Sequence, residues 1–166
     1  MGEAVGRAIW RRMRGAAALD IEVYEEVEHD PGATAQATAV VVMTAAAQAI
    51  GASGGGPAPI VGSAISALIG WLAWAGITFV IGSRIFQGTA TWGEILRTLG
   101  FAQSPNLLAV FAILPLVGWV IEAVLVFWVL VAGIVAIRQA LDFGTGRAIL
   151  TALLGGIVFQ ALQFVF

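Results

Sequence analysis

The sequence predicts an all-α integral membrane protein, a bundle of five hydrophobic segments with short interfacial helices. Its residues are 60% hydrophobic and only 11% charged, whereas soluble domains carry roughly 25% charged residues. Apolar stretches follow one another from residue 33 to residue 166, separated by short turns and by one longer polar stretch at 84–104. The longest stretch, Leu107 to Ile137, would measure about 46 Å as one helix. Because a hydrocarbon core is only ~30 Å thick, we expect this stretch to fold back on itself.

Residues 1–32 are expected to form a cytoplasmic amphipathic segment. In its arginine-rich first half, Val5, Ile9 and Met13 recur every four residues, which predicts a helix with one apolar face. This helix either lies on an anionic leaflet or is solvated, with its arginines fixing only the topology. The acidic second half, residues 20–30, predicts another short helix. That helix is expected to pair with the basic helix, bind a basic partner or face water.

The transmembrane domain is expected to cover residues 33–166 and to begin with two spans. The first, about 33–52, is rich in alanine and carries polar side chains, a composition typical of a helix shielded by others. The second, about 58–83, repeats small residues at four-residue spacing and therefore predicts close helix contact, either inside the molecule or between molecules. The candidate packing residues of this stripe are Gly62, Ser66 and Gly70.

A polar stretch after the second span predicts a short helix over residues 91–100, lying at the membrane interface. Thr91 and Glu94 have the T-x-x-E spacing of a capping box, which marks a helix start. Apolar residues on one face would contact the membrane, and Arg97 would lie on the polar face.

The third and fourth segments, about 105–117 and 119–137, are predicted to form a hairpin broken at Pro115 and Gly118. Proline cannot continue a helix hydrogen-bond ladder, and glycine tolerates the backbone angles of a reversal. The break also moves Glu122 away from the bilayer centre, where an acidic side chain costs on the order of 2.5–3.5 kcal/mol. Glu122 is then either an acid at the hairpin tip or a candidate intramembrane polar site.

The second arm of the hairpin and the segment after it complete the bundle. Ala132 and Ala136 continue the four-residue pattern of small residues and are candidate packing positions. Arg138 and Asp142 are four residues apart and can pair. The last span is expected at about 148–166.

The distribution of arginine supports five segments. All eight basic residues are arginine, and five segments with a cytoplasmic N-terminus place every one on the cytoplasmic side, as the positive-inside rule requires. The sequence therefore predicts a multi-pass membrane protein with a cytoplasmic N-terminus and the C-terminus outside. Some of these arginines either form bidentate hydrogen bonds to lipid phosphates or serve only to fix the topology. The candidates for phosphate contact are Arg11, Arg12, Arg14, Arg138 and Arg147.

Three polar stretches between the apolar segments resemble the corresponding stretches of bacterial members of the Yip domain family. These proteins are relatives of the Ypt/Rab-interacting membrane proteins. The three stretches are D-P-G-A-T-A-Q-A (30–37), T-W-G-E-I-L-R-T-L-G-F-A-Q-S-P (91–105) and I-R-Q-A-L-D-F-G-T-G-R-A-I (137–149). The resemblance implies five membrane segments in the cytoplasmic (inner) membrane of a bacterium, a tendency to associate and a non-enzymatic role. Eukaryotic relatives bind prenylated Rab GTPases, but their Asp-Leu-Tyr-Gly-Pro motif is not matched by Val23–Glu26 here. A small GTPase partner is thus implied only by family analogy.

No set of residues in the sequence has the pattern of a catalytic site, so we expect a protein that is not an enzyme. The chain has no cysteine and one histidine, which argues against Cys-ligated metals, thiol chemistry and multi-histidine sites. We expect no cofactor, and the net charge of −2 does not favour nucleic acid. The leading hypothesis is a structural or organising membrane subunit that forms homo-oligomers or joins a larger complex within the lipid bilayer. The alternative is a subunit of a small-solute or ion transporter with a polar path near Glu122.

Overall fold

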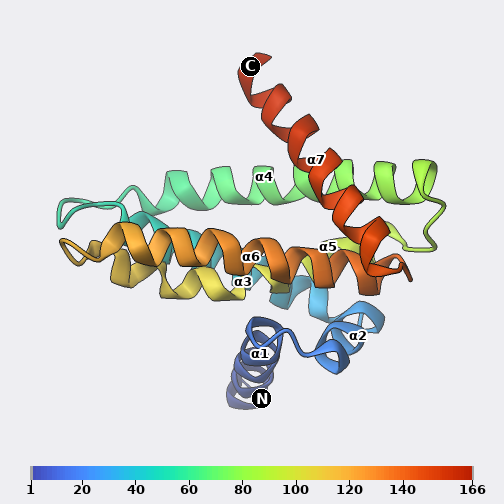
Figure 1. The fold of residues 1–166 in the computed structure, drawn as a ribbon. Helices are drawn as coiled ribbons and strands as arrows, with labels where there is room; N and C mark the ends of the chain where they lie inside the picture. Colours follow the sequence, from blue (N-terminus) through green and yellow to red (C-terminus); the bar gives the residue numbers. More distant parts are fainter. Residues whose placement is uncertain (1, 166) are drawn as a thin grey trace.

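The computed structural model describes the backbone of residues 2–165 and the side chains of residues 6–161, and within that part every regular element is helical. Charged residues near the N-terminus form two short helices, and the apolar stretches form the long ones (Figure 1). The elements are α1 (Gly2–Ala17), α2 (Ile21–His29), α3 (Ala33–Gly51), α4 (Ile60–Val80), the π-helical turn η1 (Ile81–Ile85), α5 (Trp92–Ala102), the 3₁₀-helix η2 (Ser104–Ile113), α6 (Gly118–Ala140) and α7 (Thr145–Val165).

Among the described residues, three helical stretches are long and apolar enough to cross a membrane: α3, α4 with η1, and α6. α3 and α4 pack against each other, and α5 with η2 lies between α3 and α6. α7 crosses α4 and α6 obliquely, while α1 and α2 lie along one flank (Figure 1). Among the residues whose side chains are described, α7 contributes the apolar stretch Thr145–Ala161. The predicted class, an all-α membrane protein, is confirmed, whereas the predicted count of five spans is not.

The predicted break in the central apolar run is confirmed, because η2 ends at Ile113 and α6 begins at Gly118. Leu114, which precedes Pro115, has the extended backbone (ψ 121°) that a following proline favours. The left-handed turn residue is Leu116 (φ 74°) rather than the glycine. Gly118 serves a different purpose, because a Cβ at this position would collide with the carbonyl oxygen of Ala112.

The first arm of the hairpin is made in two parts, α5 followed by η2. Eleven α-helical residues and ten 3₁₀ residues add up to about 16 Å and ~20 Å, so together they match the length of a crossing helix. Both parts contact α3 and α6. The helix begins at the predicted capping box of Thr91 and Glu94. The prediction that its apolar face contacts the membrane while Arg97 lies on an exposed polar face is wrong, because residues 95–102, Arg97 included, are all buried.

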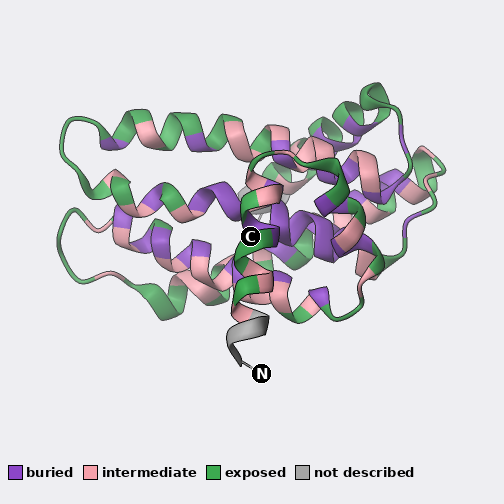
Figure 2. Ribbon diagram, turned by 90° about the horizontal axis from the view of Figure 1, so that it is seen from below, coloured by how far each residue is buried: buried purple, intermediate pink, exposed green. Residues whose placement is uncertain are grey.

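Small residues allow α3 to lie close against this two-part arm. Gly51 faces the backbone carbonyl of Ala109 in η2, and a Cβ on Gly100 of α5 would lie 2.7 Å from the Cβ of Ala37. Buried residues accordingly gather in the middle of the molecule, while the α3–α4 and η2–α6 turns at one end are largely exposed (Figure 2). The alanine-rich composition of α3 thus reflects the close approach of a neighbouring backbone.

Candidate functional site

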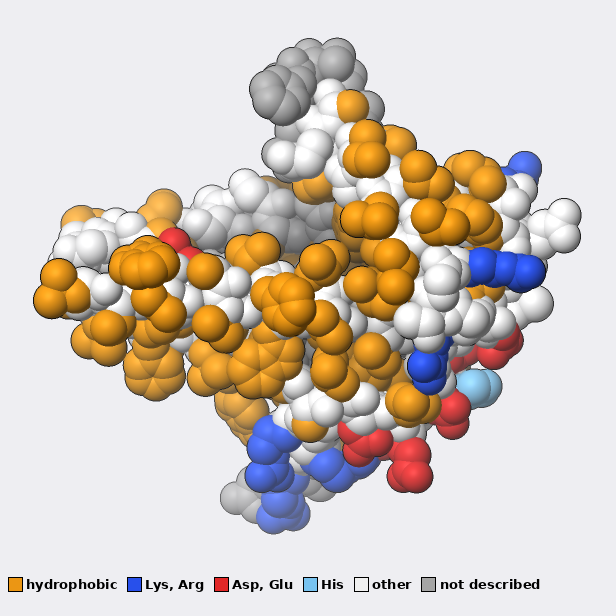
Figure 3. Space-filling view, in the orientation of Figure 1, with side chains coloured by type: hydrophobic (Ala, Val, Ile, Leu, Met, Phe, Trp, Pro, Cys, Tyr) orange, Lys and Arg blue, Asp and Glu red, His pale blue; other side chains and the backbone are white. Residues whose placement is uncertain are grey.

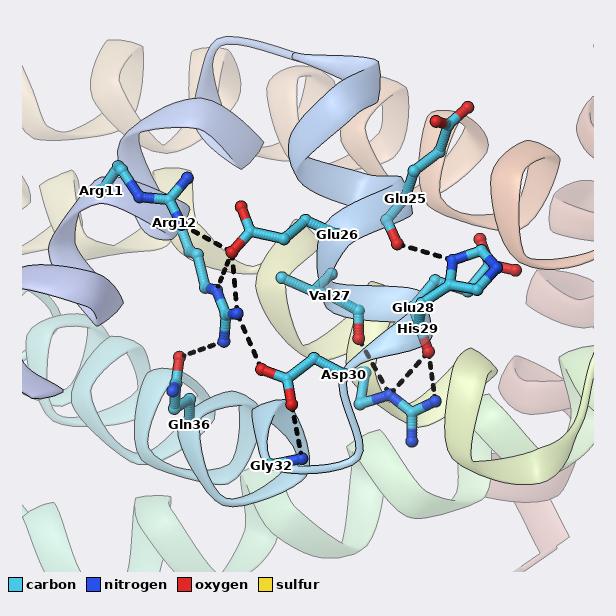
Figure 4. Close-up of polar contacts among 11 residues, drawn as sticks. Arg11, Arg12, Glu25, Glu26, Val27, Glu28, His29, Asp30, Gly32 and Gln36 are labelled. Carbon is cyan, nitrogen blue, oxygen red and sulfur yellow. Dashed lines mark hydrogen bonds and ion pairs between the residues drawn. The ribbon is translucent and has the colours of Figure 1, made fainter.

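The two N-terminal helices are joined to each other and to α3 by one buried arginine (Figure 4). Arg12 is only 7% exposed. Its Nη2 donates to Glu26 at 2.8 Å and to Asp30 at 2.7 Å, and its Nη1 donates to Gln36 of α3 at 2.8 Å. Arg11 donates to the same Glu26 carboxylate at 2.6 Å. Of the arrangements considered for the acidic helix, the structure therefore has it paired with the basic helix.

A second buried arginine, Arg97 of α5, holds the C-terminal end of α2. Its guanidinium donates to the backbone carbonyls of Val27, at 2.9 Å, and of Glu28. The last carbonyls of a helix have no partner within the helix, so a guanidinium there satisfies them. We call the surface where α1 and α2 meet α3, α5 and α6 the docking seam; its polar contacts come from Arg12, Gln36, Arg97, Trp128 and Gln139.

Aromatic side chains complete the docking seam. The Tyr24 hydroxyl is fully buried and donates to the carbonyl of Ala16 at 3.1 Å, and the Trp128 indole of α6 donates to the carbonyl of Ala17 at 2.8 Å. Met13 is also buried, so this part of the apolar face of α1 is covered by protein. The amphipathic pattern of α1 is therefore explained at Met13 by packing against the bundle.

Electrostatics differ between the two edges of α2. Hydrogen bonds from Arg11 and Arg12 lower the pKa of Glu26 to about 2, and a hydrogen bond from Arg12 lowers the pKa of Asp30. On the opposite edge, loss of water around Glu28 raises its pKa to about 7, and the nearby Glu94, Asp142 and Glu25 carboxylates add to the shift. The nearby His29 opposes the shift.

The five arginines proposed as lipid-phosphate contacts lie in different surroundings. Arg11 and Arg12 are taken up by the carboxylates of α2. Arg14 and Arg147 are exposed. Arg138 is half-buried and donates to Gln139 at 3.1 Å, so the pairing predicted with Asp142 does not form; Asp142 accepts from Thr89 at 2.8 Å. The guanidinium of Arg147 lies 6.0 Å above the ring of Phe143.

The two stripes of small residues also differ. Ala132 and Ala136 are completely buried in the core. Gly62 and Ser66 are exposed, and a Cβ on Gly62 would meet nothing within 4 Å. Gly70 lies nearer to the core, where a Cβ would make ordinary contact with Phe159. Internal packing therefore uses the stripe on α6, whereas the outer part of the stripe on α4 is left open.

The structure does not bring Glu122 into a site. Glu122 and Gln160 are exposed, and neither lines the cavity of about 640 Å³ inside the bundle. Gln48, Gln103 and Asn106 do line it. No group of three or more histidine or acidic side chains in the described part of the chain is arranged to hold a metal ion. This cavity therefore does not supply the polar path expected near Glu122.

These features define a multi-pass α-helical membrane protein with a docked polar N-terminal segment. The family model of the Yip1 domain matches residues 22–165, so the chain belongs to the Yip1 domain family. Comparison with curated proteins and with solved structures found no match in either case. The family match begins within α2 and therefore covers the acidic half of the docking seam together with the whole bundle.

Sequence reasoning missed Arg97 and Trp128 as contacts of the N-terminal segment. The sequence predicts Arg97 on the polar face of the 91–100 helix, whereas the structure buries it against the end of α2. The sequence did contain a signal for this contact. A helix that ends before Asp30-Pro31 leaves its last carbonyls without partners, so they need donors from elsewhere in the chain.

Proposed function

We propose that this protein is a non-enzymatic, multi-pass subunit that organises the membrane by helix–helix association, with α4 as its contact surface. The observation that carries the proposal is the open stripe of Gly62 and Ser66. It lies between exposed apolar side chains, of which Val61 is 75% exposed and Ile69 63% exposed. In lipid, small residues let two helix backbones approach closely, and the gain comes from packing. Such a stripe suits a second copy of the same helix, because a two-fold interface pairs a patch with itself.

The supporting context is chemical. Hydrophobic side chains cover the flank of the bundle, and charged side chains gather around the N-terminal segment and the adjoining end (Figure 3). We propose that the protein lies in the inner membrane of a bacterial cell and that this charged end faces the cytoplasm. There the exposed Arg14 and Arg147 contact lipid phosphates. The acidic side chains nearby are already paired in part with Arg11 and Arg12, which leaves the exposed arginines available to lipid.

Association is tested by cross-linking, for which the chain offers a clean background because it contains no cysteine. Ser66→Cys is expected to give a disulfide-linked dimer on mild oxidation in native membrane. Ala123→Cys, on the exposed face of α6, is the matched control and is expected to stay monomeric. Equal cross-linking of both variants, or none at Ser66→Cys, would refute the α4 interface.

Orientation is tested with the same background. Ala52→Cys, in the exposed turn after α3, and Thr145→Cys, at the exposed start of α7, place single thiols at opposite ends of the bundle (Figure 1). A membrane-impermeant maleimide added to intact cells is expected to label Ala52→Cys and to leave Thr145→Cys unlabelled until the cells are broken. The reverse pattern would overturn the proposed orientation without touching the proposed association.

A further inference from the structure

The bundle contains a cavity of about 640 Å³ among α3, α4, α6, α7 and the junction of α5 with η2. Its size falls within the range of roughly 300–1,000 Å³ that is typical of small-molecule sites. All the residues that line it are uncharged, so it suits a neutral occupant. The association proposed for α4 does not use this cavity, because Gly62 and Ser66 lie outside its lining.

One wall of the cavity is aromatic. Trp71 and Trp74 of α4 and Phe159 of α7 form this wall, and the rings of Trp74 and Phe159 pack edge to face at 5.9 Å. The Trp71 indole donates to the carbonyl of Leu96 at 3.2 Å, so its polar atom already has a partner. Aromatic side chains bind another flat ring through offset stacking or edge-to-face contact, so this wall favours a ligand that contains such a ring.

The cavity is also lined by three side-chain amides, those of Gln48, Gln103 and Asn106. Asn106 donates to Gln103 at 2.8 Å, which leaves the amide nitrogen of Gln103 and the amide oxygen of Asn106 able to bond elsewhere. Gln48 has no hydrogen-bond partner among the side chains and backbone that the structure describes. The one fully buried side-chain polar atom without a partner in that part of the chain is the Thr78 hydroxyl, so the remaining amide atoms open onto the cavity.

These amides lie near the middle of the bundle. Gln103 and Asn106 are placed where α5 meets η2, and the two elements are about 16 Å and ~20 Å long. Gln48 lies at a similar depth, because Gly51, one helical turn further along α3, packs against Ala109 before η2 ends. A hydrocarbon core is ~30 Å thick and excludes lipid headgroups, so the amides lie within it. Polar atoms left unpaired at that depth are costly.

The mouth of the cavity opens sideways, toward hydrocarbon. Val126 and Leu130 of α6 line the cavity and yet are 72% and 47% exposed. Phe127 beside them is 69% exposed, so the surface around the mouth is apolar. An occupant that passes over this rim comes from the bilayer core, because a water-soluble solute would have to cross hydrocarbon first.

We propose that the cavity binds a membrane quinone, a neutral flat ring that carries two carbonyl oxygens and a hydrocarbon tail. The ring lies against the aromatic wall, and its carbonyl oxygens accept hydrogen bonds from the amides of Gln48 and Gln103. The tail passes over the apolar rim of α6 into the bilayer. A quinone has no charge and no hydrogen-bond donor to desolvate, so it reaches the bilayer core, which a charged headgroup does not. Only binding is proposed, without electron transfer or bond formation.

The test is native mass spectrometry of the full-length chain in mild detergent after incubation with decyl-benzoquinone. Decylbenzene, which has the same carbon skeleton without the oxygens, is the matched ligand control. The chain has no cysteine and no lysine, the side chains to which quinones add most readily, so retention reports non-covalent binding. The wild type is expected to retain one decyl-benzoquinone per chain and at least tenfold less decylbenzene. Equal retention of the two ligands, or retention of neither, would overturn the proposal.

Substitutions on α6 separate the cavity from the outer surface of the bundle. Gly133 lines the cavity, and a Cβ there would meet nothing within 4 Å, so Gly133→Phe fills the space from within. Val124→Phe adds the same ring to the exposed face of the same helix and is the matched control. Gly133→Phe is expected to retain at least tenfold less decyl-benzoquinone, and Val124→Phe to retain the wild-type amount. Equal loss from both variants would place the quinone outside the cavity and overturn the proposal.

A further variant keeps the proposal open to refutation if Gly133→Phe does not fold. Gln48→Leu removes an amide from a side chain that is exposed and makes no hydrogen bond within the described part of the chain. Its retention of decyl-benzoquinone is expected to fall several-fold, while its retention of decylbenzene does not fall. Retention of decyl-benzoquinone at the wild-type level in folded Gln48→Leu would overturn the proposal.

Discussion

The N-terminal segment, residues 2–30, and the helical bundle behind it meet at the docking seam and are stabilised in different ways. The segment depends on charge: Arg12 joins Glu26, Asp30 and Gln36. The bundle depends on close packing of small residues, with Ala132 completely buried in α6. Charged contacts respond to pH and salt, whereas packed contacts respond to volume. The comparison implies that each region can be disrupted without the other.

The largest effect is expected from adding volume inside the bundle. Ala132→Leu introduces a branched side chain at a position with no exposed surface, and overpacking of this kind costs about 3 kcal/mol. The unfolding temperature in detergent should fall by several degrees. Ala123→Leu on the exposed face of α6 is the control and should change little. Equal shifts in the two variants would contradict the packing argument.

A somewhat smaller and more local effect is expected at the docking seam. Arg12→Met keeps much of the side-chain length but removes every hydrogen bond to Glu26 and Asp30, at a cost of about 2 kcal/mol. Amide hydrogen exchange should rise across α1 and α2 while the amides of α3 and α6 stay protected. Arg7→Met, at an exposed position of α1, is the matched control. Faster exchange throughout the bundle would show that the two regions are not separable.

Local features of the fold could be predicted from the sequence, but their partners could not. The capping box at Thr91 and the break at Pro115 depend on neighbouring residues, and both were predicted correctly. The burial of Arg97 depends on α2, about 70 residues away. The buried position of α5, which was predicted to lie at the surface, likewise depends on segments distant in the sequence. The same limit applies to the small-residue stripes, because spacing identifies a face without identifying what covers it.

The pH dependence of the docking seam sharpens the comparison, because the pKa of Glu26 is lowered while that of Glu28, on the other edge of α2, is raised. The pKa of Glu26 is about 2 against an ordinary 4.5, so its contribution to stability is present above about pH 4.5 and is lost as the pH falls toward 2. The pKa of Glu28 is raised to about 7, so docking weakens as the pH rises from 4.5 through 7. Exchange in α2, corrected for its intrinsic pH dependence, should be slowest near pH 5.

The control for this pH profile is Glu28→Gln, which cannot ionise. It should abolish the rise in exchange between pH 5 and pH 8 while leaving the acid-side rise, which belongs to Glu26 and Asp30. The helices of the bundle should show neither change. A profile that is the same in Glu28→Gln and wild type would exclude Glu28 as the source of the alkaline weakening.

The smallest expected change in unfolding temperature comes from glycine-to-alanine substitutions, compared between the outside and the inside of the bundle. Gly62→Ala adds a methyl group where nothing lies within 4 Å, and alanine is the better helix former by about 0.5–1 kcal/mol, so the unfolding temperature of the detergent-solubilised monomer should rise slightly. Gly100→Ala gains the same propensity but places its Cβ 2.7 Å from that of Ala37, so its unfolding temperature should fall. Opposite signs for one added methyl group would mean that contact with neighbouring helices, more than intrinsic helix preference, decides what each glycine of this bundle contributes.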